Sequence, residues 1–258
     1  NITVFFSDIR GFTTISEKLD PKVLSDLLNM YLTPMTDLVF ENQGTLDKYM
    51  GDAVMAFFGA PIHYNDHAVW ACRCALQSIA KLVVLQEEFR QKGLPIIDIG
   101  IGLNTGDCSV GNMGSQSVRS YTVMGDSVNL GSRLEGINKQ YGTRIIISEF
   151  TYKDVKDIMI CREIDLVRVK GKELPVKIYE LVAEKNAPQK ITELLNYFNE
   201  GYQNYHKKNF QEALQLFSKA LNINPEDGPS KLYMDRCHEF LNSPPPESWD
   251  GVFIMTTK

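Results

Sequence analysis

The chain of 258 residues has few cysteines, no excess of basic residues and no long apolar run. Its five cysteines show neither CxxC pairs nor the Cys/His spacing of zinc sites, so we expect reduced, mostly buried thiols and no zinc. A formal net charge of -5 provides no basic face for duplex nucleic acid, and we expect no nucleic-acid partner. No apolar stretch approaches the ~20 residues of a membrane-spanning helix. With 43% hydrophobic and 23% charged residues, the chain is typical of a globular protein with one sizeable core and a small appendage.

The sequence does not begin with methionine, and we expect it to contain no signal peptide. Its first residue, Asn1, lies at the edge of a strand pattern, so we interpret the sequence as a fragment of a longer protein. We expect the fragment to be cytoplasmic, with any sensor or membrane anchor upstream of it.

Hydrophobic periodicity predicts an α+β domain. Longer periodic stretches predict helices that begin at Asp20 or Lys22 and cover 67–92 and 126–141, the last with Gly142 as its C-cap. The order of elements fits a ferredoxin-like βαββαβ core, in which helices cover one face of an antiparallel sheet. Short apolar runs predict the strands 2–6, 44–50, 53–58, 96–104 with a return through 108–113, 121–124, 145–148, 165–169 and 176–182.

The composition changes after a linker at 184–188. Residues 194–227 partly match one 34-residue tetratricopeptide unit, and 231–241 would form a capping helix. A lone repeat cannot bury its own apolar face, so it must pack on the first domain, on a dimer mate or on a protein partner. We therefore divide the chain into a catalytic domain (1–184), a tetratricopeptide-like helical segment (185–241) and a tail (242–258) whose Trp249 suggests docking.

Two acids stand at the ends of predicted strands. Asp8 follows the strand 2–6, and Asp52 lies in the turn between 44–50 and 53–58. Each acid alone is most simply a helix N-cap or a turn former. If the strand lies beside the hairpin, both carboxylates reach one sheet edge, where a divalent cation would relieve their repulsion.

The stretch after Asp8 supports a site for phosphates. Gly11, Phe12 and Thr13 open a predicted helix and offer backbone N–H groups to an anion. The sheet edge is therefore suited to a nucleoside triphosphate with two Mg²⁺ or Mn²⁺ ions.

Four stretches resemble, in the same order, the signature sequences of class III nucleotidyl cyclases: FFSDIRGFT, LDKYMGDAVMAFFG, SYTVMGDSVNLGSRLEGINKQYG and VRVKGKELPVKIYELV. The resemblance covers residues 1 to about 182. The whole arrangement is also similar to bacterial adenylate cyclases that have an upstream CHASE2-type sensor and a tetratricopeptide tail.

The resemblance implies roles for the acids and for two base-reading residues. Asp8 and Asp52 match the metal-binding aspartates, and the backbone carbonyl of Ile9 would complete the second metal site. Lys48 matches the residue that reads the purine edge, which is Lys in adenylate cyclases and Glu in guanylate cyclases. Thr122 matches the position where Asp or Thr accepts from the adenine amino group. Because adenine presents a ring acceptor and an amino donor, this pair favours ATP.

Asn129 and Arg133 lie four residues apart and share a face of the predicted helix. Alone they are typical of a solvated helix face, but the resemblance implies that Asn129 orients the ribose and Arg133 stabilises charge on the α-phosphate. Lys170 matches the lysine that holds the β- and γ-phosphates. Gly131 replaces a frequent Ala between Asn129 and Arg133, at about 1 kcal/mol of helix propensity.

These features predict an adenylate cyclase that converts ATP to 3′,5′-cyclic AMP and pyrophosphate. In the family, one chain supplies the metal-binding residues and the other the remaining groups, so a homodimer would form two shared sites. One alternative is a guanylate cyclase, which Lys48 disfavours. A diguanylate cyclase would need a Gly-Gly-acid-Glu-Phe turn, where this chain has Met-Gly-Asp-Ala-Val. Another alternative is a non-catalytic dimerising module that binds a partner through its tail.

Overall fold

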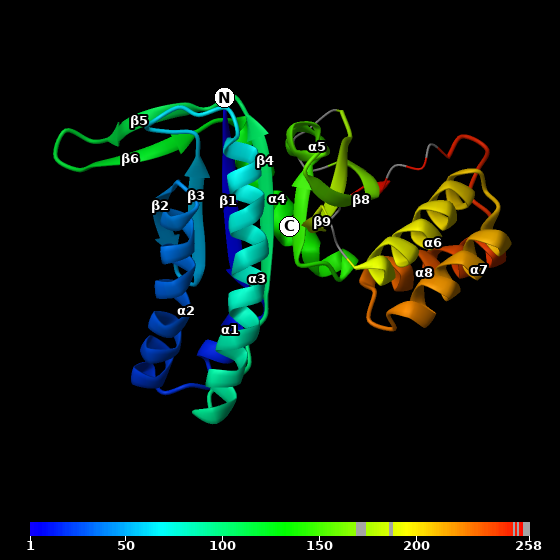
Figure 1. Ribbon diagram of the computed structural model, residues 1–258, viewed down its shortest axis with the longest axis horizontal. Helices are drawn as coiled ribbons and strands as arrows, with labels where there is room; N and C mark the ends of the chain where they lie inside the picture. Colours follow the sequence, from blue (N-terminus) through cyan, green and yellow to red (C-terminus); the bar gives the residue numbers. More distant parts are fainter. Residues whose placement is uncertain (169–173, 186–187, 250, 252, 255–258) are drawn as a thin grey trace.

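The computed structural model describes the chain except residues 169–173, 186–187, 250, 252 and 255–258. A mixed eight-stranded sheet runs through the molecule in the order β10-β8-β9-β7-β4-β1-β3-β2 (Figure 1). Its strands are β1 (Ile2–Ile9), β2 (Gly44–Met50), β3 (Ala53–Phe58), β4 (Ile99–Gly106), β7 (Ile145–Ser148), β8 (Met159–Arg168), β9 (Val176–Glu184) and β10 (Phe253–Ile254). A separate ribbon of β5 (Ser109–Gly114) and β6 (Arg119–Met124) extends from one end of the molecule. The helices are α1 (Phe12–Ser16), α2 (Pro21–Glu41), α3 (His67–Gln91), α4 (Asp126–Tyr141), α5 (Glu149–Val155), α6 (Gln189–His206), α7 (Phe210–Ile223) and α8 (Gly228–Asn242).

The predicted ferredoxin-like core is confirmed. Four strands lie in the order β4-β1-β3-β2, with α2 connecting β1 to β2 and α3 connecting β3 to β4. All three of these strand pairs are antiparallel, while β7 adds to β4 in parallel. Because β1 is central, any side chain at its end lies between the β2–β3 hairpin and β4.

The alternation of β1 divides the core between two faces of the sheet. Phe5 and Ile9 pack with α2 and α3 on one face. Val4 and Phe6 face the other way, where a Cβ on Gly131 of α4 would lie 2.6 Å from Val4. The expectation that helices cover one face is therefore wrong for α4, which covers the opposite face and carries Asn129 and Arg133.

Helix α3 differs from the expectation drawn from apolar runs. By length and composition it is long and apolar enough to cross a membrane, although half of its apolar window is buried inside this molecule. Its buried residues, including Ala75 and Leu82, belong to the core beneath the sheet. Two of the five free cysteines, Cys72 and Cys74, are also buried there, as expected for structural thiols.

One local prediction is wrong, and one helix was missed. The stretch 108–113 does not return along β4, because both edges of β4 are already paired with β1 and β7. It pairs instead with β6 in the ribbon, where Asn112 lies opposite Tyr121. Helix α5 was not predicted; its cap is Ser148, whose hydroxyl accepts a hydrogen bond from the Thr151 N–H at 3.2 Å.

The C-terminal helices pack directly on the sheet of the first domain. Residues of α6, α7 and α8 share one hydrophobic cluster with the sheet, and Phe198, Tyr233 and Ile164 all belong to it. The Tyr233 hydroxyl also donates to the backbone carbonyl of Ile164 at 2.7 Å. Trp249 of the tail lies 5.4 Å from the ring of Tyr205, measured between ring centroids. Of the three packing surfaces considered from the sequence, the helices thus use the first domain of the same chain.

Candidate active site

The two predicted acids meet at the end of β1. The backbone N–H of Ile9 lies 3.0 Å from an oxygen of Asp8 and 3.1 Å from an oxygen of Asp52. This approach follows from the fold, because β1 pairs with β3 and Asp52 occupies the turn before β3, beside Gly51 with its φ of 69°. The sequence argument that both carboxylates reach one sheet edge is met by this geometry.

The electrostatics of this acid pair suit a divalent cation. Burial, reinforced by the neighbouring Asp8, raises the pKa of Asp52 to about 7. A cation between the carboxylates would remove this penalty on the charged form. Within the described part of the chain, no group of three or more His, Cys, Asp or Glu forms a ready metal site. Two carboxylates are a usual protein contribution where Mg²⁺ also binds substrate phosphates, and the acid pair fits such a site.

Glu135 is a third acid beside the pair, and it was not singled out from the sequence. Its carboxylate covers Gly100, where an added Cβ would lie 2.5 Å from a Glu135 oxygen, and Gly100 pairs with Asp8 across β1 and β4. Burial first, then the charge of Asp8, raises the pKa of Glu135 to about 8. Its position in a helical motif gave no signal, because an acid in an amphipathic helix is usually solvated.

The predicted base-reading residues also lie together. The ammonium of Lys48 on β2 is 3.3 Å from the hydroxyl of Thr122 on β6. The Thr122 hydroxyl donates to the carboxylate of Asp47 at 2.6 Å, and the Val123 N–H approaches the same oxygen at 3.3 Å. Asp47 is a second residue that the sequence argument missed, since an acid next to a lysine gave no reason to expect burial.

The other predicted residues are on α4, at the start of α1 and in a stretch outside the described residues. Asn129 is exposed and Arg133 half-buried on α4, and neither side chain makes a hydrogen bond or ion pair with the described residues. Gly11 precedes the short helix α1 with φ of 65°, so Phe12 and Thr13 form its first turn. Lys170 lies outside the described residues.

Comparison with known proteins identifies the family. The family described as "Adenylate and Guanylate cyclase catalytic domain" matches residues 1–201. The chain belongs to this family.

Three relatives illustrate the likeness of the cyclase domain. "Adenylate cyclase 1" of Rhizobium meliloti is 38% identical over 181 residues, 70% of this chain and 27% of that protein, so the chain spans about a quarter of its length. The crystal structure of the adenylyl cyclase CyaB from P. aeruginosa is 41% identical, with a TM-score of 0.67 over 72% of this chain and 95% of that chain. The guanylyl cyclase Cya2 has the same TM-score at 35% identity, over 73% of this chain and 94% of that chain. The fold alone therefore does not separate ATP from GTP.

Within one chain, the cyclase domain presents its groups as separate sets. The acids Asp8 and Asp52 lie at the end of β1, while Lys48 and Thr122 lie where β2 meets β6. The side of α4 that contacts the sheet is formed by buried residues such as Leu130, which leaves Asn129 on the outer side. No recorded contact joins the acids to the base-reading pair among the described residues.

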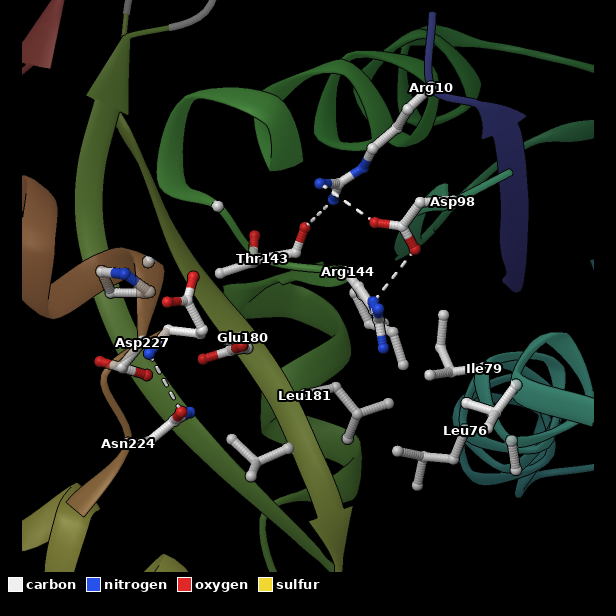
Figure 2. Close-up of a pocket in the computed structure, with 18 residues that line it drawn as sticks. Arg10, Leu76, Ile79, Asp98, Thr143, Arg144, Glu180, Leu181, Asn224 and Asp227 are labelled. Carbon is white, nitrogen blue, oxygen red and sulfur yellow. Dashed lines mark hydrogen bonds and ion pairs between the residues drawn. The ribbon is translucent and has the colours of Figure 1, made fainter. Parts of the chain in front are cut away.

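A cavity of about 790 Å³ lies between α3, β9 and the connection from α7 to α8 (Figure 2). At its polar end Arg10 and Arg144 both pair with Asp98, at 3.5 and 3.1 Å. Arg10 also donates to the carbonyl of Thr143, just after α4. None of the described residues assigned to metal or substrate lines this cavity. It is thus separate from the cyclase site, although Arg10 connects it to the end of β1.

Proposed function

We propose that this domain is an adenylate cyclase that converts ATP to 3′,5′-cyclic AMP and pyrophosphate for intracellular signalling. The observation that carries the proposal is the contact of Lys48 with Thr122, a donor beside an oxygen acceptor, 3.3 Å apart. Adenine offers the complementary edge, with a ring nitrogen that accepts and an amino group that donates.

The acid pair would hold the cofactor. Enzymes of this family use divalent metal ions, and Asp8, Asp52 and the carbonyl of Ile9 are the groups that we assign to two Mg²⁺ or Mn²⁺ ions. When bound, these ions would activate the ribose 3′-hydroxyl and neutralise charge on the phosphates. The fit is supported by the shared approach of both carboxylates to the Ile9 N–H.

The other residues would position the substrate. Asn129 orients the ribose so that its 3′-oxygen lies in line with the α-phosphorus, and Arg133 stabilises the charge that develops there. We assign the β- and γ-phosphates to Lys170 and to the backbone N–H groups of residues 11–13. Catalysis then consists mainly of positioning and charge stabilisation.

A homodimer would complete each site. Cyclase domains of this family act as dimers and bind ATP or GTP. Here Tyr49 and Met50 of β2 and Tyr121 and Met124 of β6 are large apolar residues with 36–58% of their surface exposed. Such exposure beside the base-reading residues supports an interface between two chains. A protein partner for the helical segment, an upstream sensor and a cytoplasmic location remain part of the proposal.

The direct test is to incubate the purified chain with ATP or GTP and Mn²⁺ or Mg²⁺ and to identify the product. We expect cyclic AMP from ATP, with GTP a poor substrate. Asp52→Ala should lower turnover by at least roughly a hundredfold, because one metal-binding carboxylate is lost. Asp26→Ala, at an exposed position of α2, is the matched control. Undiminished turnover in the folded Asp52→Ala protein would falsify the assignment of the metal site.

A further inference from the structure

Asp47 is a buried acid to which the proposed reaction gives no role. Its side chain is 0% exposed, and one of its carboxylate oxygens lies 3.1 Å from the ammonium of Lys48. The other carboxylate oxygen accepts a hydrogen bond from the Thr122 hydroxyl at 2.6 Å. One carboxylate therefore touches both residues that we assign to the base.

A β-bulge makes this arrangement possible. Neighbouring residues of a regular strand point to opposite faces of the sheet, so Asp47 and Lys48 would be separated. In β2, however, Leu46 pairs with Ala56 and Lys48 pairs with Met55, which leaves Asp47 as an extra residue. Such bulges change the direction in which a side chain points, and they are frequent beside active sites.

The contact with Asp47 decides what Thr122 can offer to a ligand. A threonine hydroxyl has one proton and two lone pairs, so it can present either a donor or an acceptor. A carboxylate has no proton to donate and only accepts, and this one also lies 3.1 Å from the ammonium of Lys48. With its proton donated to Asp47, Thr122 presents lone pairs alone.

This distinction matches the difference between the two purines. At the same ring position, adenine carries an amino donor and guanine a carbonyl acceptor. A Thr122 oxygen restricted to accepting would bond the adenine amino group and would face the guanine carbonyl with a second acceptor. The mismatch leaves polar groups unpaired, which is the strongest basis for rejecting a related substrate.

We propose that Asp47 is a positioning residue that fixes Thr122 as a hydrogen-bond acceptor and thereby sets the preference for ATP over GTP. This inference rests on the proposed cyclase function and on the assignment of Lys48 and Thr122 to the base.

The test compares kcat/KM for ATP with kcat/KM for GTP in Asp47→Asn. The amide has nearly the same shape but can donate as well as accept, so the Thr122 hydroxyl can turn and donate to guanine. We expect the ATP:GTP ratio to fall by roughly tenfold, the value of about one neutral hydrogen bond. Asp26→Asn removes an equal charge from an exposed site on α2 and should leave the ratio unchanged.

A second variant separates this role from a purely structural one. Thr122→Asp alone would place two carboxylates side by side and should lower activity towards both nucleotides. Combined with Asp47→Asn, the new carboxylate accepts from the amide and presents an acceptor to adenine. The double variant should therefore regain most of the ATP preference. If Asp47 only supported packing, the double variant should be worse than either single variant.

The outcomes are distinct. If the parent protein forms no cyclic AMP, the proposed function itself is wrong, whatever the role of Asp47. Cyclic AMP from the parent together with an unchanged ATP:GTP ratio in folded Asp47→Asn overturns the role of Asp47 alone. If Asp47→Asn does not fold, Asp47→Ser is the substitute, because without the carboxylate the Thr122 hydroxyl is free to donate.

Discussion

At the scale of single residues, the shared approach of Asp8 and Asp52 to one N–H couples metal binding to pH. The pKa of Asp52 is raised to about 7 by burial and by Asp8. A proton therefore competes with the cation near neutral pH. We expect the metal concentration for half-maximal activity to rise as pH falls below about 7, by up to roughly tenfold per pH unit. Metal titrations at a series of pH values measure this.

The raised pKa of Asp52 also makes the stability of the fold depend on pH. The pKa of Asp52 is higher in the folded chain than in the unfolded chain, so its contribution to stability is present at low pH and is lost as pH rises through about 7. The metal-free protein should therefore gain thermal stability on going from pH 8 to pH 6, and Asp52→Asn should reduce this gain. An equal gain in both proteins would contradict the shift.

The residues of this site differ in how far sequence could reveal them. Asp8 and Asp52 could be predicted, because each stands at the end of a strand whose neighbour follows from the hairpin. Glu135 and Asp47 could not, because their burial depends on Gly100 across the sheet and on a one-residue bulge. Neither partner is encoded in the local pattern around the acid.

At the scale of elements, glycines decide how closely α4 lies on the sheet. A Cβ at Gly102 of β4 would lie 2.2 Å from the backbone nitrogen of Glu135 and 2.5 Å from the carbonyl oxygen of Gly131. The substitution of Ala by Gly131, which seemed only to weaken the helix, is likewise explained by its contact with Val4. Close packing here outweighs helix propensity.

We therefore expect Gly102→Ala to push α4 away from the sheet and to lower the free energy of unfolding by about 2–3 kcal/mol. Because Asn129 and Arg133 move with α4, activity should fall as well. Gly136→Ala on the exposed side of the same helix has nothing within 4 Å and should instead stabilise by about 0.5–1 kcal/mol. Urea unfolding of both variants measures the contrast, and equal effects would contradict the packing explanation.

Elements were predictable where the signal is local. Helix α4 begins and ends at the predicted residues. Its end is set by Gly142, which adopts φ of 63° as the C-cap. The pairing of β5 was not predictable, since the partner of a strand depends on which edges of the sheet are free. The face of the sheet that α4 covers could not be predicted either. It depends on contacts with glycines far away in the sequence, such as Gly102 of β4.

At the scale of the whole molecule, the separation of the acids from the other groups predicts complementation. Asp8→Ala lacks a metal ligand, and Asn129→Ala lacks the ribose contact. If two chains share each site, a mixed dimer contains one intact site and one doubly defective site. Equal mixing and re-equilibration should restore roughly a quarter of the parent activity, since about half of the dimers are mixed. An inactive mixture with proven mixed dimers would rule out shared sites.

The helical segment is joined to the catalytic domain by a buried arginine. Arg162 of β8 is 2% exposed and donates two hydrogen bonds to Asp227, at 2.8 and 2.9 Å. It also pairs with Glu180 of β9, and its guanidinium lies 4.4 Å from the ring centroid of Phe198 on α6. Asp227 in turn caps α8 by accepting from the Ser230 N–H at 3.1 Å. The sheet, α6 and α8 thus meet at one cation.

Arg162→Met should therefore loosen the whole segment. The substitution leaves the carboxylates of Glu180 and Asp227 without their cation in a buried place, which costs about 3–5 kcal/mol of unfolding free energy. Lys231→Met is the matched control, because Lys231 pairs with Glu226 where 47% and 86% of the two side chains are exposed, and such a pair contributes less than about 1 kcal/mol. Urea unfolding gives both values, and limited proteolysis between β9 and α6 reports detachment. If Arg162→Met unfolds at the same urea concentration as Lys231→Met, the segment is held by its apolar contacts and not by this arginine.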